Sequence, residues 1–295
     1  MKIMITGASG FIGSNLCSML INKNFNVISL GRTNPSREIS KKIKHIPYLM
    51  GEKIPDDINL FAPDILIHLA WDEIPFFSEK NCLDNVISQL SFLKQIKEIS
   101  TVKKIIAAGS CLEYAGSVGS CEEGEQVSPN SFFSWAKQSI SNYIKVLCEE
   151  QKIAWTWFRI FYVYGPGQRS ESLIPYIFQC YKLNKKVEIN NPTAANDFIY
   201  IDDVVDAFIS AVDNFECQGI INLGSGAPVT ADSIHLLIKG VIHQTNLMER
   251  NNYTKVFDDK CIWADTSVMQ NHNIIPKISM KEGIDLIYKS FSNEQ

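Results

Sequence analysis

The sequence predicts an α/β protein with a doubly wound parallel sheet of the Rossmann type and a smaller C-terminal substrate lobe. Three observations support this prediction. Short apolar runs alternate with helical patterns through the first half of the chain, and a glycine-rich turn follows the first run. After Gly165-Pro166-Gly167 the alternation gives way to shorter, loop-rich segments. Continuous apolar strands between helices are typical of a parallel sheet covered on both faces.

The expected elements follow from this alternation. Strands are predicted at residues 2–6, 26–30, 65–70, 104–108 and 155–160, and two long helices with apolar stripes at 78–100 and 131–151. We place the Rossmann domain at 1–163, with a return segment at about 197–213, and the second lobe at 164–295.

Composition narrows the class of protein. The 295 residues are 45% hydrophobic, which is enough for a full core, and the net charge of -4 argues against a general nucleic-acid or membrane-surface binder. The first apolar run is too short for a signal peptide, and no stretch has the length of a membrane span, so a cytoplasmic protein is expected. Eight cysteines without CxxC or Cys/His clusters predict reduced thiols and no metal site.

The turn after the first strand, TGASGFIG at residues 6–13, carries the clearest chemical signal. Gly7 permits a tight turn, Gly10 leaves room for a pyrophosphate, and Gly13 lets the following helix pack close to the strand. Backbone N–H groups at the start of that helix favour the negative charge of phosphates. This arrangement predicts a dinucleotide pocket.

Six segments in order resemble the extended short-chain dehydrogenase/reductase superfamily, in its NAD-dependent epimerase/dehydratase branch, which acts on nucleotide-sugars. They are TGASGFIG (6–13), PDILIHLA (63–70), AAGSCLEYAG (107–116), FRIFYVYGPGQ (158–168), NDFIYIDDVVDAF (196–208) and INLGSG (221–226). The resemblance implies that residues 1–163 bind NADP and that 164–295 bind a nucleotide-sugar. The cofactor-binding residues it implies are Gly7, Ser9, Gly10, Phe11, Ile12, Gly13, Gly31, Arg32, Leu69, Ala70 and Lys137.

The end of the second strand indicates which dinucleotide binds. NAD-preferring members of the family place an acid there, whereas this chain has Gly31-Arg32, with Arg37 close behind. A guanidinium can pair with a 2′-phosphate, and an acid would repel it. We therefore expect NADP(H) rather than NAD as cofactor.

The catalytic set that the resemblance implies is incomplete. Ser110 and Lys137 match the serine and lysine of the family, but the tyrosine position is Phe133, which has no titratable oxygen. Three explanations stay open. The position was changed from tyrosine to phenylalanine to trap a complex, or another group supplies the proton, or the protein binds its ligands without chemistry. Candidates for the other group are Glu113, Tyr114, Tyr162 and Tyr164.

Local residues also order the activities found in the family. The 4,6-dehydratases carry an acid pair after the serine, whereas Cys111-Leu112 follows Ser110 here. With Arg32, this favours NADPH-dependent reduction of a nucleoside-diphosphate 4-keto-(deoxy)sugar at C4, in deoxysugar synthesis for surface polysaccharide. The similarity is closest to the 4-reductases of CDP- or dTDP-linked deoxysugars. The alternatives are an NAD(P)-dependent 4-epimerase and a non-catalytic protein that binds nucleotide-sugar or dinucleotide.

The resemblance further implies a substrate site and a partner. The substrate-binding residues are Asn85, Ser110, Cys111, Tyr162, Ser172, Leu173 and Lys255. Helices 78–100 and 131–151 carry more apolar surface than one sheet face needs. Such helices pair across a two-fold axis in this family, so a homodimer is expected.

Overall fold

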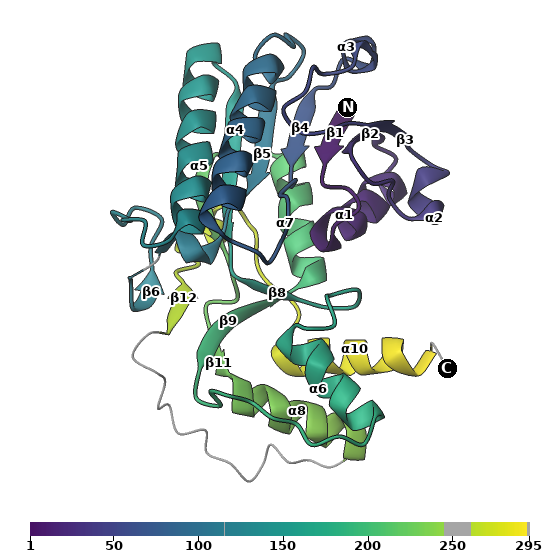
Figure 1. The fold of residues 1–295 in the computed structure, drawn as a ribbon, viewed down its shortest axis with the longest axis vertical. Helices are drawn as coiled ribbons and strands as arrows, with labels where there is room; N and C mark the ends of the chain where they lie inside the picture. The colour runs from purple at the N-terminus through teal and green to yellow at the C-terminus, as the bar shows by residue number, and fades with distance from the viewer. Residues whose placement is uncertain (115, 245–260, 294–295) are drawn as a thin grey trace. The chain divides into compact units, whose positions relative to one another are not determined.

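The computed structural model describes residues 1–114, 116–244 and 261–293. Within these residues a seven-stranded sheet has the order β10-β7-β5-β4-β1-β2-β3 (Figure 1). Its strands are β1 (Lys2–Thr6), β2 (Asn26–Gly31), β3 (Lys44–Pro47), β4 (Ile65–His68), β5 (Lys104–Ala108), β7 (Ala154–Ile160) and β10 (Gly219–Leu223). The sheet is parallel and Rossmann-like, so the predicted fold class is confirmed.

The register of the central strands aligns their carboxyl ends. Thr6 at the end of β1 lies opposite Leu30 of β2 and His68 of β4. The chain therefore leaves all three strands at the same edge, where parallel sheets of this kind bind their ligands. Two strands, β3 and β10, were not predicted from the sequence.

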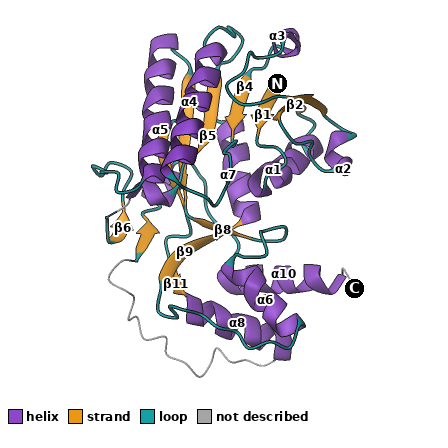
Figure 2. Ribbon diagram, viewed as in Figure 1, coloured by secondary structure: helices purple, strands orange, loops and turns teal. Residues whose placement is uncertain are grey.

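Helices cover the sheet as the alternating pattern requires. Helices α4 (Glu79–Ile96) and α5 (Phe132–Gln151) lie side by side over one face (Figure 2). Met4, Leu66 and Ile105 point into one core with residues of these helices. On β7, Phe158 lies on the opposite face of the sheet. Its ring contacts Phe208 of α7 (Ile201–Asp213), with 4.9 Å between the ring centroids. The remaining helices of this part are α1 (Phe11–Asn22), α2 (Arg37–Ser40), α3 (Asp56–Phe61) and the short 3-10 helix η1 (Cys111–Tyr114).

Local sequence fixes the start of both long helices. The Ser78 hydroxyl accepts a hydrogen bond from the backbone N–H of Asn81 at 3.2 Å and so caps α4. In α5, Ser131 and Ser134 form a reciprocal capping box. The helix ends at Lys152, which adopts a left-handed conformation at φ +56°.

The chain divides into two compact units. One comprises residues 1–116, 123–160 and 205–222, and the other 117–122, 161–204 and 223–295. The boundary expected at 163/164 stays a prediction. The second unit contains a sheet of order β11-β9-β8 and the parallel pair β12-β6. Its elements are β6 (Gly119–Cys121), β8 (Tyr162–Tyr164), α6 (Leu173–Lys182), β9 (Ala195–Tyr200), β11 (Pro228–Thr230), α8 (Ala231–His243), β12 (Ile262–Ala264), α9 (Ser267–Asn271) and α10 (Met280–Asn293).

A buried carboxylate joins several segments of this second unit. Asp197 of β9 is fully buried. Its Oδ1 accepts from the Ser225 N–H at 2.7 Å, and its Oδ2 accepts from the N–H groups of Gly226 at 2.9 Å and Ala264 at 3.0 Å. These charge-assisted bonds tie β9 and β12 to the turn after β10.

Three features of the structure relate to the expectations from composition: the state of the cysteines, groups of metal-ligating side chains, and the length and hydropathy of the helices. All eight cysteines are free and buried. Among the described residues, no group of His, Cys, Asp and Glu side chains could hold a metal ion. None of the described helices is both long and apolar enough to cross a membrane.

Candidate active site

The glycine turn forms a close-fitting backbone cradle at the end of β1. Gly7 has φ +75°, and a Cβ atom there would lie 2.8 Å from the Leu69 carbonyl carbon. A Cβ at Gly13 would lie 2.1 Å from the Gly7 oxygen, so only glycine permits this approach of helix and turn. Gly10 is the N-cap residue of α1, and no side chain of the described residues caps that helix start. Phosphate oxygens fit the exposed N–H groups there, so the cradle suits the dinucleotide that the fold implies.

The end of β4 closes the other side of this cradle. Leu69 N–H donates to the Thr6 carbonyl at 3.2 Å, and Ala70 N–H donates to the Thr6 hydroxyl at 3.3 Å. His68 is buried between Thr6 and Gln89, and burial lowers its pKa to about 4. The imidazole is therefore neutral at pH 7 and acts as a hydrogen-bonding core residue.

The predicted cofactor residue Arg32 has a partner that the sequence did not indicate. Its guanidinium forms a two-pronged ion pair with Asp72, with Nη2 to Oδ1 at 2.5 Å and Nη1 to Oδ2 at 3.2 Å. Asp72 lies in the loop after β4. Both side chains are about half exposed, at 57% and 48%.

A buried charge network holds the backbone of the predicted catalytic serine. The Glu113 carboxylate accepts from the Ser110 N–H at 2.9 Å, from the Trp157 indole at 3.0 Å and from Arg159 Nε at 3.2 Å. Gly109 leaves no room for a side chain, because a Cβ would lie 2.2 Å from the Trp157 indole nitrogen. Burial raises the pKa of Glu113, while the Arg159 charge opposes that rise. The network fixes the turn that presents Ser110.

The other predicted catalytic positions lie together on α5 under an aromatic cover. The Phe133 ring packs against Trp71 at 5.0 Å and Phe77 at 4.0 Å between centroids. Lys137 Nζ lies 4.4 Å from the centroid of the Trp71 ring and donates to the Ala108 carbonyl at 2.9 Å. Ala108 is two residues before Ser110, so the Lys137 amino group and the backbone of Ser110 both lie at the end of β5. Burial lowers the pKa of Lys137 to about 8.

The burial of the alternative proton donors differs among the four candidates. Glu113, Tyr114 and Tyr164 are almost fully buried. Burial raises the pKa of both tyrosines, which makes their phenols weaker proton donors. Tyr162 is 38% exposed, and its ring packs against Phe198 in the second unit at 5.7 Å between centroids and a tilt of 43°. Tyr162 is therefore the candidate with a solvent-facing side chain.

The predicted substrate residues other than Ser110 and Tyr162 fall into three groups. Asn85 and Cys111 are buried, and Asn85 uses its amide to hold the backbone of Asp72 and Asn81. Ser172 and Leu173 lie at the start of α6 in the second unit. Lys255 lies outside the described residues. The roles of all three groups in substrate binding stay predictions.

Three residues that sequence reasoning missed also belong to this edge of the sheet. Trp71 and Asp72 directly follow PDILIHLA, and an aromatic and an acid at such a strand end were a usable signal. Trp71 Nε1 is one of the buried polar atoms without a partner among the described residues. Phe77 gave no signal, because its contact with Phe133 depends on the path of the loop.

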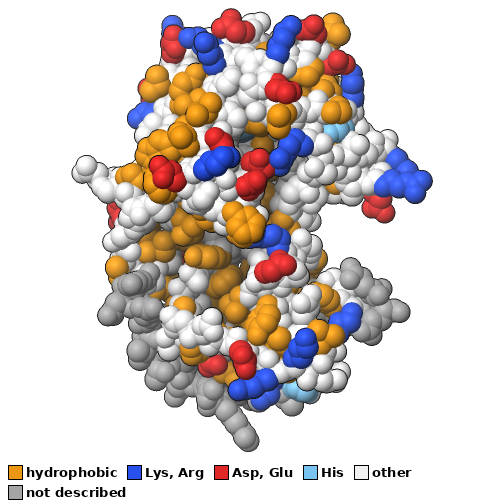
Figure 3. All heavy atoms as spheres, in the orientation of Figure 1, with side chains coloured by type: hydrophobic (Ala, Val, Ile, Leu, Met, Phe, Trp, Pro, Cys, Tyr) orange, Lys and Arg blue, Asp and Glu red, His pale blue; other side chains and the backbone are white. Residues whose placement is uncertain are grey.

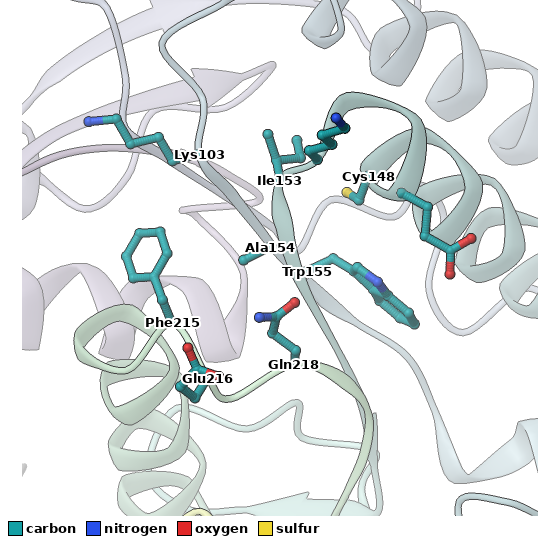
Figure 4. Close-up of a pocket in the computed structure, with 10 residues that line it drawn as sticks. Lys103, Cys148, Ile153, Ala154, Trp155, Phe215, Glu216 and Gln218 are labelled. Carbon is teal, nitrogen blue, oxygen red and sulfur yellow. The ribbon is translucent and has the colours of Figure 1, made fainter.

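A hollow of about 620 Å³ lies elsewhere, at the amino ends of β5, β7 and β10. Lys103, Ala154 and Gln218 line it from the strand starts, beside Trp155 and Phe215 (Figure 4). It is therefore at the edge of the sheet opposite to the glycine turn. None of the predicted site residues that the structure describes lines it.

Comparison with known proteins identifies the family. Residues 3–224 match the model of the NAD dependent epimerase/dehydratase family. The chain belongs to this family, whose members are enzymes of the short-chain dehydrogenase/reductase type, and the predicted family and enzyme class are confirmed.

Individual relatives are distant but extend over nearly the whole chain. The chain is 24% identical to dTDP-4-dehydro-6-deoxyglucose reductase of Escherichia coli, over 98% of this chain and 96% of that protein. It is 24% identical to a putative UDP-glucose 4-epimerase of Methanocaldococcus jannaschii, over 99% and 98%. It is 25% identical to CDP-abequose synthase of Salmonella muenchen, over 92% and 88%.

Solved structures show the same fold. The UDP-glucose 4-epimerase of Thermotoga maritima, solved with UDP-glucose, matches with a TM-score of 0.84 at 22% identity, over 100% of this chain and 99% of that one. The UDP-glucuronic acid 4-epimerase of Bacillus cereus, solved with NAD, matches with a TM-score of 0.83 at 24% identity, over 100% and 99%.

Proposed function

We propose that the chain reduces a nucleoside-diphosphate 4-keto-(deoxy)sugar at C4 with NADPH. The observation that carries this proposal is that Lys137, bonded to the Ala108 carbonyl, and Ser110, two residues further on, both lie at the end of β5, at the same sheet edge as the glycine cradle. The absence of an acid beside Ser110 argues against dehydration. Relatives named as deoxysugar reductase and CDP-abequose synthase support reduction.

The chain's own groups have distinct tasks in this reaction. The glycine turn and Arg32 hold the dinucleotide, which supplies hydride to the sugar carbonyl carbon when it is bound. Ser110 donates a hydrogen bond to the carbonyl oxygen as negative charge develops on it. Lys137 contributes positive charge nearby. The oxygen also takes up a proton, which Phe133 cannot give and which water or another side chain of the protein supplies.

NADP(H) as cofactor is part of the proposal. Arg32 supports it, because a guanidinium suits a 2′-phosphate. NAD is the alternative, since the structurally similar epimerase of Bacillus cereus was solved with NAD. In this alternative the chain is a 4-epimerase, as three of the similar proteins described above are named.

A binding and turnover panel separates these functions. The protein is mixed with NADPH or NADH and with UDP-, GDP-, CDP- or dTDP-linked 4-keto-6-deoxyhexoses, and thermal shift and loss of NADPH fluorescence are followed. We expect the largest shift with NADPH and a CDP- or dTDP-sugar, and NADPH consumption equal to the sugar reduced. Lys137→Met is the inactive control. Tightly held NAD that copurifies, with no net consumption of NADPH, would favour the epimerase. Binding without any hydride transfer would favour the non-catalytic protein.

The proposed enzyme is a homodimer that pairs through α4 and α5. Figure 3 shows apolar side chains gathered over these two helices. They include Leu83 and Ile87 of α4 and Phe132, Trp135 and Val146 of α5, all of them exposed. A second copy of the chain would cover this patch.

Ile87→Asp is expected to convert this dimer to a monomer, because it places a charge in the apolar contact. Mass is measured by light scattering after size exclusion. The matched control is Leu60→Asp on α3, since Leu60 is also exposed, at 84%, but lies on another helix. A monomeric parent protein, or equal effects of both substitutions, would contradict this interface.

A further inference from the structure

The ion pair between Arg32 and Asp72 joins two strands that are not neighbours. Arg32 follows β2 and Asp72 lies in the loop after β4, and β1 runs between these strands in the sheet. The pair therefore bridges the carboxyl end of β1, where the glycine turn begins at Gly7. A dinucleotide that uses this turn must lie beside or beneath the bridge.

The backbone of Asp72 is held in place by hydrogen bonds to the side chain of Asn85. Asn85 of α4 accepts from the Asp72 N–H at 2.9 Å and donates to the Asp72 carbonyl at 3.3 Å. Asn85 is itself only 5% exposed. The loop thus holds the Asp72 carboxylate toward Arg32 on a fixed backbone. In this respect the pair differs from an ordinary surface ion pair between two mobile side chains.

We propose that Asp72 determines the selectivity between NADP(H) and NAD(H) by competing with the 2′-phosphate for Arg32. This inference rests on the proposed dinucleotide-binding function. A 2′-phosphate must take the guanidinium from Asp72 and then lie near a carboxylate of like charge. A 2′-hydroxyl is neutral and leaves the ion pair intact. Asp72 therefore weakens NADP(H) binding selectively.

Cofactor titrations of single and double variants test this competition. Dissociation constants for NADPH and NADH are measured by the fluorescence of the bound nicotinamide, without sugar. Asp72→Asn keeps the backbone contacts with Asn85 and should tighten NADPH binding about 5- to 10-fold, with NADH unchanged. Arg32→Ala should weaken NADPH selectively. In the Arg32→Ala background, Asp72→Asn should have no further effect.

The controls distinguish this mechanism from a general change of charge. Asp57→Asn also removes one carboxylate from an exposed ion pair, with Lys44, and should leave both dissociation constants unchanged. Equal changes for NADPH and NADH, or an Asp72→Asn effect that persists without Arg32, would overturn the inference while leaving dinucleotide binding intact. Failure of every variant and of the parent to bind either cofactor would overturn the proposed function too. Asp72→Ser serves as a second variant if Asp72→Asn does not fold.

Discussion

Phe133→Tyr is expected to raise the rate of hydride transfer about 10²–10⁴-fold, the usual contribution of general acid–base catalysis. The substitution adds one hydroxyl at the position where the family carries its tyrosine. Lys137 is one turn further along α5, and its Nζ lies 5.8 Å from the centroid of the Phe133 ring. A positive charge at this distance lowers the pKa of a phenol, so the new tyrosine could exchange a proton near neutral pH.

The packing around Phe133 accommodates a tyrosine, so a change in rate can be attributed to the added hydroxyl. The ring is 7% exposed and lies against Trp71 and Phe77, so tyrosine can keep the same contacts. Single-turnover transfer from NADPH to a 4-keto sugar is measured in both proteins. Phe132→Tyr is the matched control, because it adds the same phenol one residue away on a ring that is 48% exposed. Its rate should equal that of the parent.

The outcome also separates the three explanations for Phe133. A large gain supports a site that is complete apart from the tyrosine. A parent that already turns over quickly, with little gain, points to another proton donor, of which Tyr162 has the most exposed side chain of the four candidates. No transfer in either protein supports ligand binding without chemistry.

The sheet was predictable where its strands are buried and apolar. Residues 2–6, 26–30 and 104–108 are mostly apolar, and each is a strand of the sheet. The edge strand β3 was missed because KHIP carries a lysine, a histidine and a proline in four residues. β10 was missed because it joins the sheet from beyond the point where the alternation breaks.

The candidate site was predictable only where one local segment makes it. The glycine cradle depends on backbone geometry within a few residues, so TGASGFIG sufficed to locate it. The Arg32–Asp72 pair depends on strand order and on the path of a loop, which periodicity does not reveal. Asn85 matched a family position for substrate, yet its amide holds the Asp72 backbone. An amide on a helix has no sequence feature that separates these uses.

Substitution of two buried lysines, Lys104 and Lys137, by methionine is expected to change the free energy of unfolding differently. Lys104 is fully buried, and its Nζ donates to the carbonyls of Ala211 at 2.7 Å, Asn214 at 2.8 Å and Cys217 at 2.9 Å, where α7 ends. Lys104→Met removes this donor from all three carbonyls. The carbonyl of Asn214 still accepts from the Cys217 N–H, and that of Cys217 still accepts from the Thr156 hydroxyl. The free energy of unfolding should fall by about 3 kcal/mol or more.

Lys137→Met should instead leave the free energy of unfolding unchanged or increase it. Lys137 has one such hydrogen bond, to Ala108, and a contact with the Trp71 ring. Burial lowers its pKa from 10.5 to about 8, as it does for Lys104. At neutral pH the folded protein therefore carries the cost of a buried charge, which one carbonyl acceptor offsets less than three do. That cost is about 3 kcal/mol at most, and methionine removes it. Hydride transfer should nevertheless fall by about 100-fold or more.

The pH dependence of the free energy of unfolding tests whether Lys137 is a buried lysine with a lowered pKa. Between about pH 8 and 10.5 the unfolded chain binds a proton at Lys137 that the folded chain does not, so this residue makes stability rise with pH across that window. Lys104, whose pKa burial also lowers to about 8, adds a rise of the same sign. Denaturant titrations of the parent, Lys104→Met and Lys137→Met at pH values across the window should show a flatter rise in each variant. A loss of stability in Lys137→Met as large as that in Lys104→Met would contradict a lysine kept for chemistry. Such a loss would mean that Lys137 stabilises the fold, as Lys104 does through its hydrogen bonds to three carbonyls.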